Sequence, residues 1–142
     1  TVDDEGVEWH RTGDVGHLDS EGRLWVEGRM AHLVSTADGP VTPVPLEIAA
    51  EAATGLRCAV TGVGPAGCAQ VVVVVEHEGK KGLAGGELDR SVREALAPQA
   101  VAAVLTVPSL PVDIRHNSKI DRTRLGRWAD ALLAGGPAPR RV

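Results

Sequence analysis

The stretch Gln70-Val71-Val72-Val73-Val74-Val75-Glu76 decides the fold of this chain. Its five consecutive valines favour extended backbone, because a branched β-carbon restricts the side chain. A strand with one face in solvent would alternate apolar and polar residues, whereas an unbroken apolar run requires burial on both faces. We therefore predict a strand over 70–76 in the middle of a sheet.

Two further strands are predicted around this one. An apolar run over 57–63 precedes it across a Gly/Pro turn, and a second run over 101–107 follows it. The residues over 79–86 are predicted to form a surface loop. Nearer the start of the chain, two short apolar runs flank an Asp-Ser-Glu-Gly turn over 19–22, a pattern typical of a β-hairpin.

Three helices are predicted between and after these strands. The first covers 46–53, with Pro45 in its first turn and Gly55 at its end. The second covers 87–96, and the third follows Asp121, which stands where a helix N-cap belongs. The apolar face of the third helix comprises Leu125, Trp128, Ala129, Leu132 and Leu133. The fold class is therefore α+β: a small mixed sheet of about three strands with helices packed on it, preceded by a β-hairpin.

Composition excludes several classes of protein. The chain has 142 residues, 43% of them hydrophobic, which suits one domain or one domain with a fragment of a neighbour. Its net charge of −4 lacks the basic excess of a nucleic-acid-binding protein. There is no apolar run long enough for a membrane span and no signal-peptide pattern, so we expect a cytoplasmic protein. The two cysteines are expected to be free thiols, and no metal site is predicted.

The chain begins with Thr1 and enters at once into a charged, patterned stretch. We therefore expect it to be a piece of a longer protein.

Three clusters of polar residues could carry chemistry. They are His10-Arg11-Thr12-Gly13-Asp14, the pair Gly28-Arg29, and Asp113-Ile114-Arg115-His116-Asn117-Ser118-Lys119-Ile120-Asp121. Each has an ordinary interpretation, since Asp often caps turns and an isolated Lys is usually a solvated surface charge. The third cluster is unusual in placing two basic residues, a His and an Asn in a short loop just before an amphipathic helix. There Lys119 would present a held positive charge to an anion.

In this order and spacing, the three clusters resemble motifs of the adenylate-forming superfamily, which comprises acyl-CoA synthetases, peptide-synthetase adenylation domains and luciferases. The (Y/H)RTGD motif matches His10–Asp14. The GRxD hinge motif matches Gly28-Arg29-Met30-Ala31, with Ala31 where the family usually has Asp. The carboxy-terminal (N)GK(I)xR motif matches Asn117 to Arg122. The match spans most of the chain.

The last motif is most similar to that of the β-lactone synthetases of bacterial olefin and β-lactone biosynthesis. The similarity rests on Asp113, Arg115, His116, Asn117, Lys119 and Ile120. Those enzymes adenylate a β-hydroxy acid, and the substrate's own hydroxyl then closes the lactone with release of AMP. The segment 34–47 also lacks the Lys and the Gly-aromatic-basic-Ile element of thioester-forming relatives. The resemblance therefore implies a β-hydroxy acid substrate and no need for coenzyme A.

The resemblance also implies roles for individual residues. Lys119 would be catalytic, bridging the acyl carboxylate and the α-phosphate of ATP, and Asp14 and Arg29 would contact the nucleotide ribose. Arg115, His116 and Asn117 would shape the segment that carries Lys119 or contact the intermediate. ATP with Mg would be bound mainly by a large amino-terminal domain that lies outside this chain, so the chain alone is predicted to be inactive.

By the same resemblance, 1–28 would be the tail of that large adenylation domain and 29–142 a mobile carboxy-terminal lid. The hinge would comprise Gly28, Arg29 and Ala31, and Ala31 removes the carboxylate that the family usually has there. Two alternatives stay open: the lid of an acyl-CoA or aryl-CoA ligase, and a non-catalytic interaction module. A module of that kind would keep its activity when Lys119 is changed to Ala.

Overall fold

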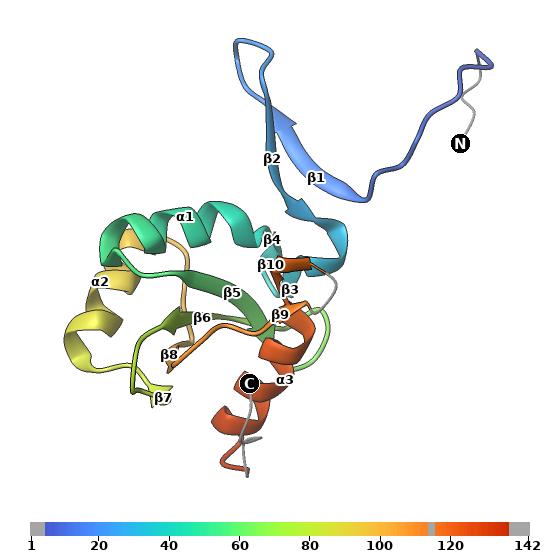
Figure 1. The fold of residues 1–142 in the computed structure, drawn as a ribbon. Coiled ribbons are helices and arrows are strands. Elements are labelled where there is room, and N and C mark those ends of the chain that lie inside the picture. Colours follow the sequence, from blue (N-terminus) through green and yellow to red (C-terminus); the bar gives the residue numbers. More distant parts are fainter. Residues whose placement is uncertain (1–4, 114–115, 137–142) are drawn as a thin grey trace.

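The structure is a computed structural model that describes residues 5–113 and 116–136. A β-hairpin and an extended segment before it project from a body of sheet and helices (Figure 1). The hairpin consists of β1 (Asp14–Leu18) and β2 (Leu24–Arg29), and a short 3-10 helix, η1 (Met30–His32), leads from it into the body. The predicted hairpin is confirmed, and it stands outside the body of the fold.

The body is built on a mixed sheet of four strands in the order β5-β6-β8-β7. β5 (Cys58–Val63) pairs antiparallel with β6 (Gln70–Glu76), β6 pairs parallel with β8 (Ala103–Val107), and β7 (Gly82–Leu83) pairs antiparallel with β8. The interior position predicted for the valine strand is confirmed. Within the predicted loop over 79–86 the structure has the strand β7. This strand has only two residues, and its Leu83 is 73% exposed, so the sequence there has no apolar alternation that would predict a strand.

The five valines divide between two cores, one on each face of the sheet. Val71, Val73 and Val75 belong to a core completed by α1 (Pro43–Thr54) and α2 (Gly86–Leu96). Val72 and Val74 belong to the core under α3 (Arg122–Leu133). Successive side chains of a strand point to opposite faces, so helices on both faces require the five central residues of β6 to be apolar.

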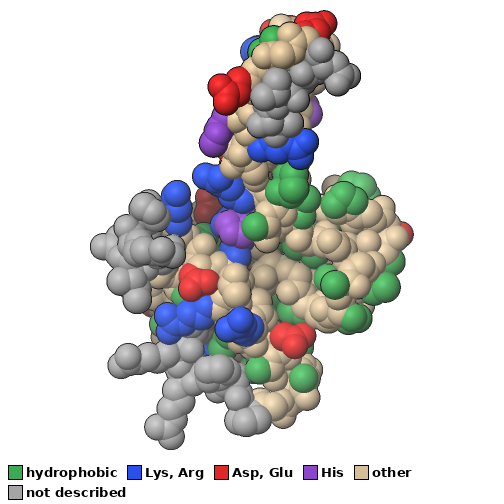
Figure 2. Space-filling view, turned by 90° about the vertical axis from the view of Figure 1, so that its right-hand side faces the viewer, with side chains coloured by type: hydrophobic (Ala, Val, Ile, Leu, Met, Phe, Trp, Pro, Cys, Tyr) green, Lys and Arg blue, Asp and Glu red, His purple; other side chains and the backbone are tan. Residues whose placement is uncertain are grey.

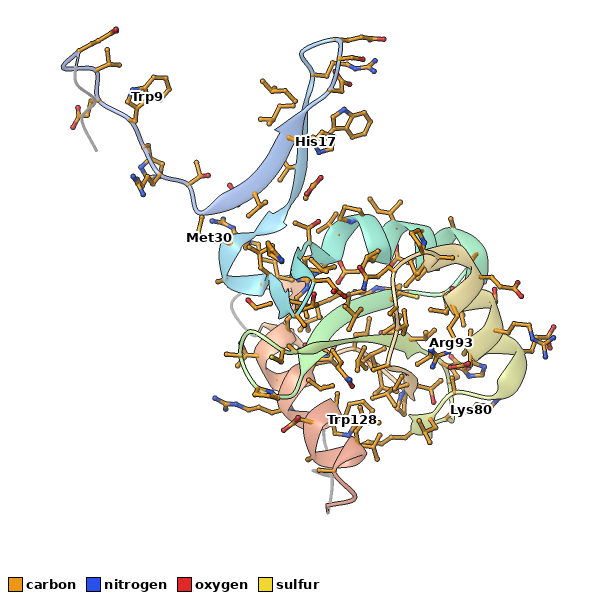
Figure 3. The ribbon with its side chains drawn as sticks, turned by 180° about the vertical axis from the view of Figure 1, so that it is seen from behind. Trp9, His17, Met30, Lys80, Arg93 and Trp128 are labelled. Carbon is orange, nitrogen blue, oxygen red and sulfur yellow. The ribbon has the colours of Figure 1, made fainter. Side chains whose placement is uncertain are left out.

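The helix boundaries follow the predicted signals closely. α1 has proline in its first turn and ends at Gly55, whose left-handed φ of 67° favours glycine. Asp121 caps α3 by accepting a 3.0 Å hydrogen bond from the backbone nitrogen of Arg124. The aromatic ring of Trp128 on α3 points into the body of the fold (Figure 3), where this residue is 1% exposed.

Two small antiparallel pairs complete the described part of the chain. β3 (Val34–Thr36) pairs with β4 (Gly39–Val41), and β9 (Val112–Asp113) pairs with β10 (His116–Ile120). The prediction of a loop over 113–121 is therefore wrong for Asp113 and for 116–120. Its polar residues have no apolar alternation, and an irregular register to a two-residue partner leaves little pattern to read.

Candidate functional site

The root of the hairpin brings together two of the predicted nucleotide-binding residues. Asp14 and Arg29 are direct partners in the register of β1 and β2, and Arg29 Nε lies 2.9 Å from Asp14 Oδ1. Arg29 also donates a 2.8 Å hydrogen bond from Nη1 to the backbone oxygen of Thr12. Strand pairing thus joins two clusters that lie fifteen positions apart in the sequence.

This pair is accessible to a ligand. The side chains of Arg29 and Asp14 are 53% and 37% exposed. An ionised carboxylate accepts hydrogen bonds from hydroxyl groups, and the guanidinium beside it supplies donors in a fixed plane. The arrangement is chemically suited to a vicinal diol such as a ribose.

The predicted hinge residues lie at the end of β2 and in η1, next to this pair in the chain. Gly28 has a φ of 131°, a backbone conformation that other residues rarely adopt, and a Cβ there would lie 3.4 Å from Val44 Cγ2. Met30 donates a 2.8 Å backbone hydrogen bond to the oxygen of Gly13. Ala31 lies in η1 and is exposed, so its methyl group holds nothing in place of the missing carboxylate.

Lys119 lies on β10 and is exposed, and the described residues provide no carboxylate that pairs with it. Its neighbours are fixed: Ile120 packs against the core under α3, and the backbone nitrogen of Asp121 donates a 2.9 Å hydrogen bond to the oxygen of Pro111. The side chain therefore projects from an anchored segment. His116 and Asn117 also lie on β10, but their side chains, and all of Arg115, lie outside the described residues.

Sequence reasoning missed a buried ion pair beneath this segment. Arg122 Nη2 lies 2.8 Å and 2.6 Å from Glu47 Oε1 and Oε2, and Oε1 also accepts a 2.8 Å hydrogen bond from the backbone nitrogen of Val60. The side chains of Arg122 and Glu47 are only 16% and 11% exposed. The pair ties α1 and α3 to the edge strand β5. Its partners are 75 positions apart, so no local spacing indicates it.

A groove of about 410 Å³ runs between the hinge and α3. Ala31 and His32 line one side, and Arg122 and Arg127 line the other. Burial and then the positive charge of Arg122 lower the pKa of His32, so its imidazole is more readily neutral than an exposed one. Lys and Arg side chains gather around a histidine on the face below the hairpin (Figure 2).

Within residues 5–113 and 116–136, no three His, Cys, Asp or Glu side chains are grouped to hold a metal ion, and no helix could span a membrane.

Comparisons with known proteins find relatives among synthetases and ligases. The chain is 41% identical over 134 residues to an olefin β-lactone synthetase of Stenotrophomonas maltophilia, a match that covers 87% of this chain and 23% of that protein. It is 31% identical over 122 residues to an indoleacetate–CoA ligase of Aromatoleum aromaticum, covering 84% and 22%. No protein-family model matches.

Among solved structures, ATP-bound MatB from Rhodopseudomonas palustris matches with a TM-score of 0.68 and 26% identity. This match covers 88% of the present chain and 25% of that one. The chain thus spans about a quarter of the length of the proteins that it matches.

Proposed function

Because the chain belongs to the adenylate-forming superfamily of ligases and synthetases, we propose that it is the carboxy-terminal lid of an ATP-dependent β-lactone synthetase. The observation that carries the proposal is the 41% identity to an olefin β-lactone synthetase over 87% of the chain. The family uses ATP. That this protein converts a β-hydroxy acid, and does so in the cytoplasm where ATP is supplied, is part of the proposal.

The reaction has two steps. The carboxylate of a β-hydroxy acid attacks the α-phosphorus of ATP, pyrophosphate leaves, and an acyl-adenylate forms. The β-hydroxyl of the substrate then loses its proton and attacks the acyl carbon, and AMP leaves as the β-lactone closes. In the first step two anions approach each other, so positive charge that is already in place lowers the barrier.

Lys119 is the residue proposed to supply that charge. Its ammonium group projects from an anchored strand, where it is available to a carboxylate and a phosphate at once. Arg115, His116 and Asn117 are proposed to shape this segment or to contact the intermediate. Asp14 and Arg29 are proposed to hold the ribose hydroxyls, and their side-by-side placement and exposure support that role.

The proposed domain division places 1–28 in the tail of a large amino-terminal domain and 29–142 in the lid. The exposed apolar side chains of the hairpin support it, since Leu24, Trp25 and Val26 are 68%, 53% and 60% exposed. Apolar side chains gathered on both faces of a projecting element are typical of a surface that another unit covers. We propose that ATP with Mg is bound mainly by that large domain.

A second candidate, the lid of an acyl-CoA ligase, is favoured by the 31% identity to an indoleacetate–CoA ligase. The two candidates differ in their products. The complete protein is incubated with ATP and a β-hydroxy acid, with and without coenzyme A, and the products are identified by mass spectrometry. We expect a lactone in both mixtures. A thioester in the mixture with coenzyme A, and no lactone in either mixture, would refute the β-lactone proposal. ATP–pyrophosphate exchange by the 142-residue chain alone would refute its assignment as an incomplete part of the enzyme.

A further inference from the structure

Glu27, one residue before the hinge glycine, links the hairpin to the body of the fold. Its Oε1 lies 2.6 Å from His17 Nδ1 on the opposite strand of the hairpin. Its Oε2 accepts a 3.1 Å hydrogen bond from Thr42 Oγ1, at the start of α1. The Glu27 side chain is 23% exposed, and its bond with Thr42 is partly shielded from water. One carboxylate therefore contacts both sides of the hinge.

Thr42 indicates that this contact is specific. It is the N-cap residue of α1, a position where a threonine hydroxyl normally accepts a hydrogen bond from the first turn of the helix. Here the hydroxyl makes no such bond, since Pro43 and Pro45 in that turn have no N–H group, and it donates to Glu27. The one described contact of this hydroxyl is therefore with the hairpin.

The backbone around Glu27 shows why such an anchor matters. Gly28, with its positive φ, lies in the chain between Glu27 and the residues assigned to the lid. Ala31 has only a methyl group, so it supplies no carboxylate that could hold the hinge. A rotation about Gly28 moves the lid relative to Glu27 and pulls Thr42 away from the carboxylate. The hydrogen bond between Glu27 and Thr42 is therefore made in this orientation of the lid and broken in others.

We propose that Glu27 is a positioning residue that holds the lid in the orientation seen here by accepting the hydrogen bond of Thr42. The inference rests on the proposed function for its catalytic consequence, because only a lid that moves needs to be held. Its physical part, the restraint of the hairpin relative to the body, can be tested on the chain alone. His17 strengthens the restraint by fixing the Glu27 carboxylate from the other strand.

The restraint is tested by backbone ¹⁵N relaxation of the 142-residue chain, comparing the hairpin with β5 and β6. The variants are Thr42→Val, which keeps the pair between Glu27 and His17, and Glu27→Ala, which removes both contacts. Glu21→Ala is the matched control, since its carboxylate pairs with Arg23 within the hairpin turn. We expect hairpin order parameters of about 0.85 in the wild type and the control, falling to about 0.6 or lower in the other two. A hairpin that is equally rigid in Thr42→Val, or mobile in the wild type, overturns the proposal.

The catalytic consequence is tested in the complete protein by measuring both half-reactions. ATP–pyrophosphate exchange reports adenylation, and product release reports the second step. We expect Thr42→Val to change the ratio of the two rates about tenfold, as loss of one hydrogen bond to a carboxylate predicts, and Glu21→Ala to leave it unchanged. An unchanged ratio in Thr42→Val overturns the positioning role. If the complete protein has no exchange activity, the proposed function is refuted. The relaxation experiment still decides whether Glu27 restrains the hairpin.

Discussion

The valine strand and the hairpin are both β-structure, yet they meet opposite surroundings. Val71 to Val75 on β6 are at most 2% exposed, because helices cover both faces of the sheet. Leu24, Trp25 and Val26 on β2 are each more than half exposed, although they are as apolar as the valines. The body of the fold buries its own apolar residues, whereas the hairpin presents them outward. The residues proposed to bind the nucleotide and to form the hinge lie where the two regions join.

The largest expected effect lies in the body, at the buried ion pair. Arg122→Met leaves the Glu47 carboxylate buried without its partner, and the free energy of unfolding should fall by about 3–5 kcal/mol. Urea denaturation followed by circular dichroism measures it. Arg124→Met, an exposed residue of the same helix, is the control and should change little. Equal stability of the two variants would show that the pair does not hold α1 and α3 together.

The same substitution in each region tests the contrast directly. Leu125→Ala opens a cavity under α3, where this side chain is 0% exposed, and should lower the free energy of unfolding by about 2–5 kcal/mol. Leu24→Ala removes a side chain that is 68% exposed and should change it by less than about 0.5 kcal/mol. Both values come from urea denaturation of the chain. A comparable loss in Leu24→Ala would mean that the hairpin contributes to the folding of the body.

The reactivities of the two cysteines measure how well the body of the fold is packed, without any substitution. Burial raises the pKa of the Cys58 thiol to about 11, whereas Cys68 is exposed. At pH 8 we expect iodoacetamide to alkylate native Cys58 about a hundredfold more slowly than Cys68, because the thiolate is the reacting form. Peptide mass spectrometry over a time course measures both rates, and 6 M urea should abolish the difference by exposing Cys58. Equal rates in the native chain would contradict the burial of β5.

The smallest effect concerns the hairpin turn. Hydrogen bonds, first from the Trp25 indole and then from the Arg23 side chain, hold the pKa of Asp19 well below its ordinary value of 3.8. A lowered pKa means that the ionised carboxylate stabilises the turn above the ordinary pKa, and that this contribution is lost as the pH falls through the lowered one. The indole N–H resonance of Trp25 should therefore titrate with a midpoint below pH 3.8 and lose this response in Asp19→Asn. A midpoint at or above that value would show that the turn is not held by Asp19.

Local patterns in the sequence predicted the body well. The valine run, the Asp121 cap and the apolar face of the last helix are each set by neighbours within a few residues. The structure confirms them except at Leu133, which was predicted on the apolar face and is 40% exposed. The strand β10 was missed because its polar residues pair with only a two-residue partner.

Contacts between distant residues were beyond local patterns. The motifs identified Asp14 and Arg29, but strand register places them side by side. Neither the pair of Arg122 with Glu47 nor the bond of Glu27 with Thr42 follows any periodicity, because each joins separate elements. Residue types and motifs thus predicted candidate chemistry, while the geometry that supports it came from tertiary structure.

ATP–pyrophosphate exchange by the complete protein tests whether Lys119 supplies positive charge to adenylation. Lys119→Ala is compared with Lys80→Ala, an exposed lysine in the segment between β6 and β7, with circular dichroism confirming that both variants fold. We expect exchange to fall about 10²- to 10³-fold in Lys119→Ala and to be unchanged in Lys80→Ala. Exchange at the wild-type rate in Lys119→Ala would rule out this role for Lys119 and favour a non-catalytic module.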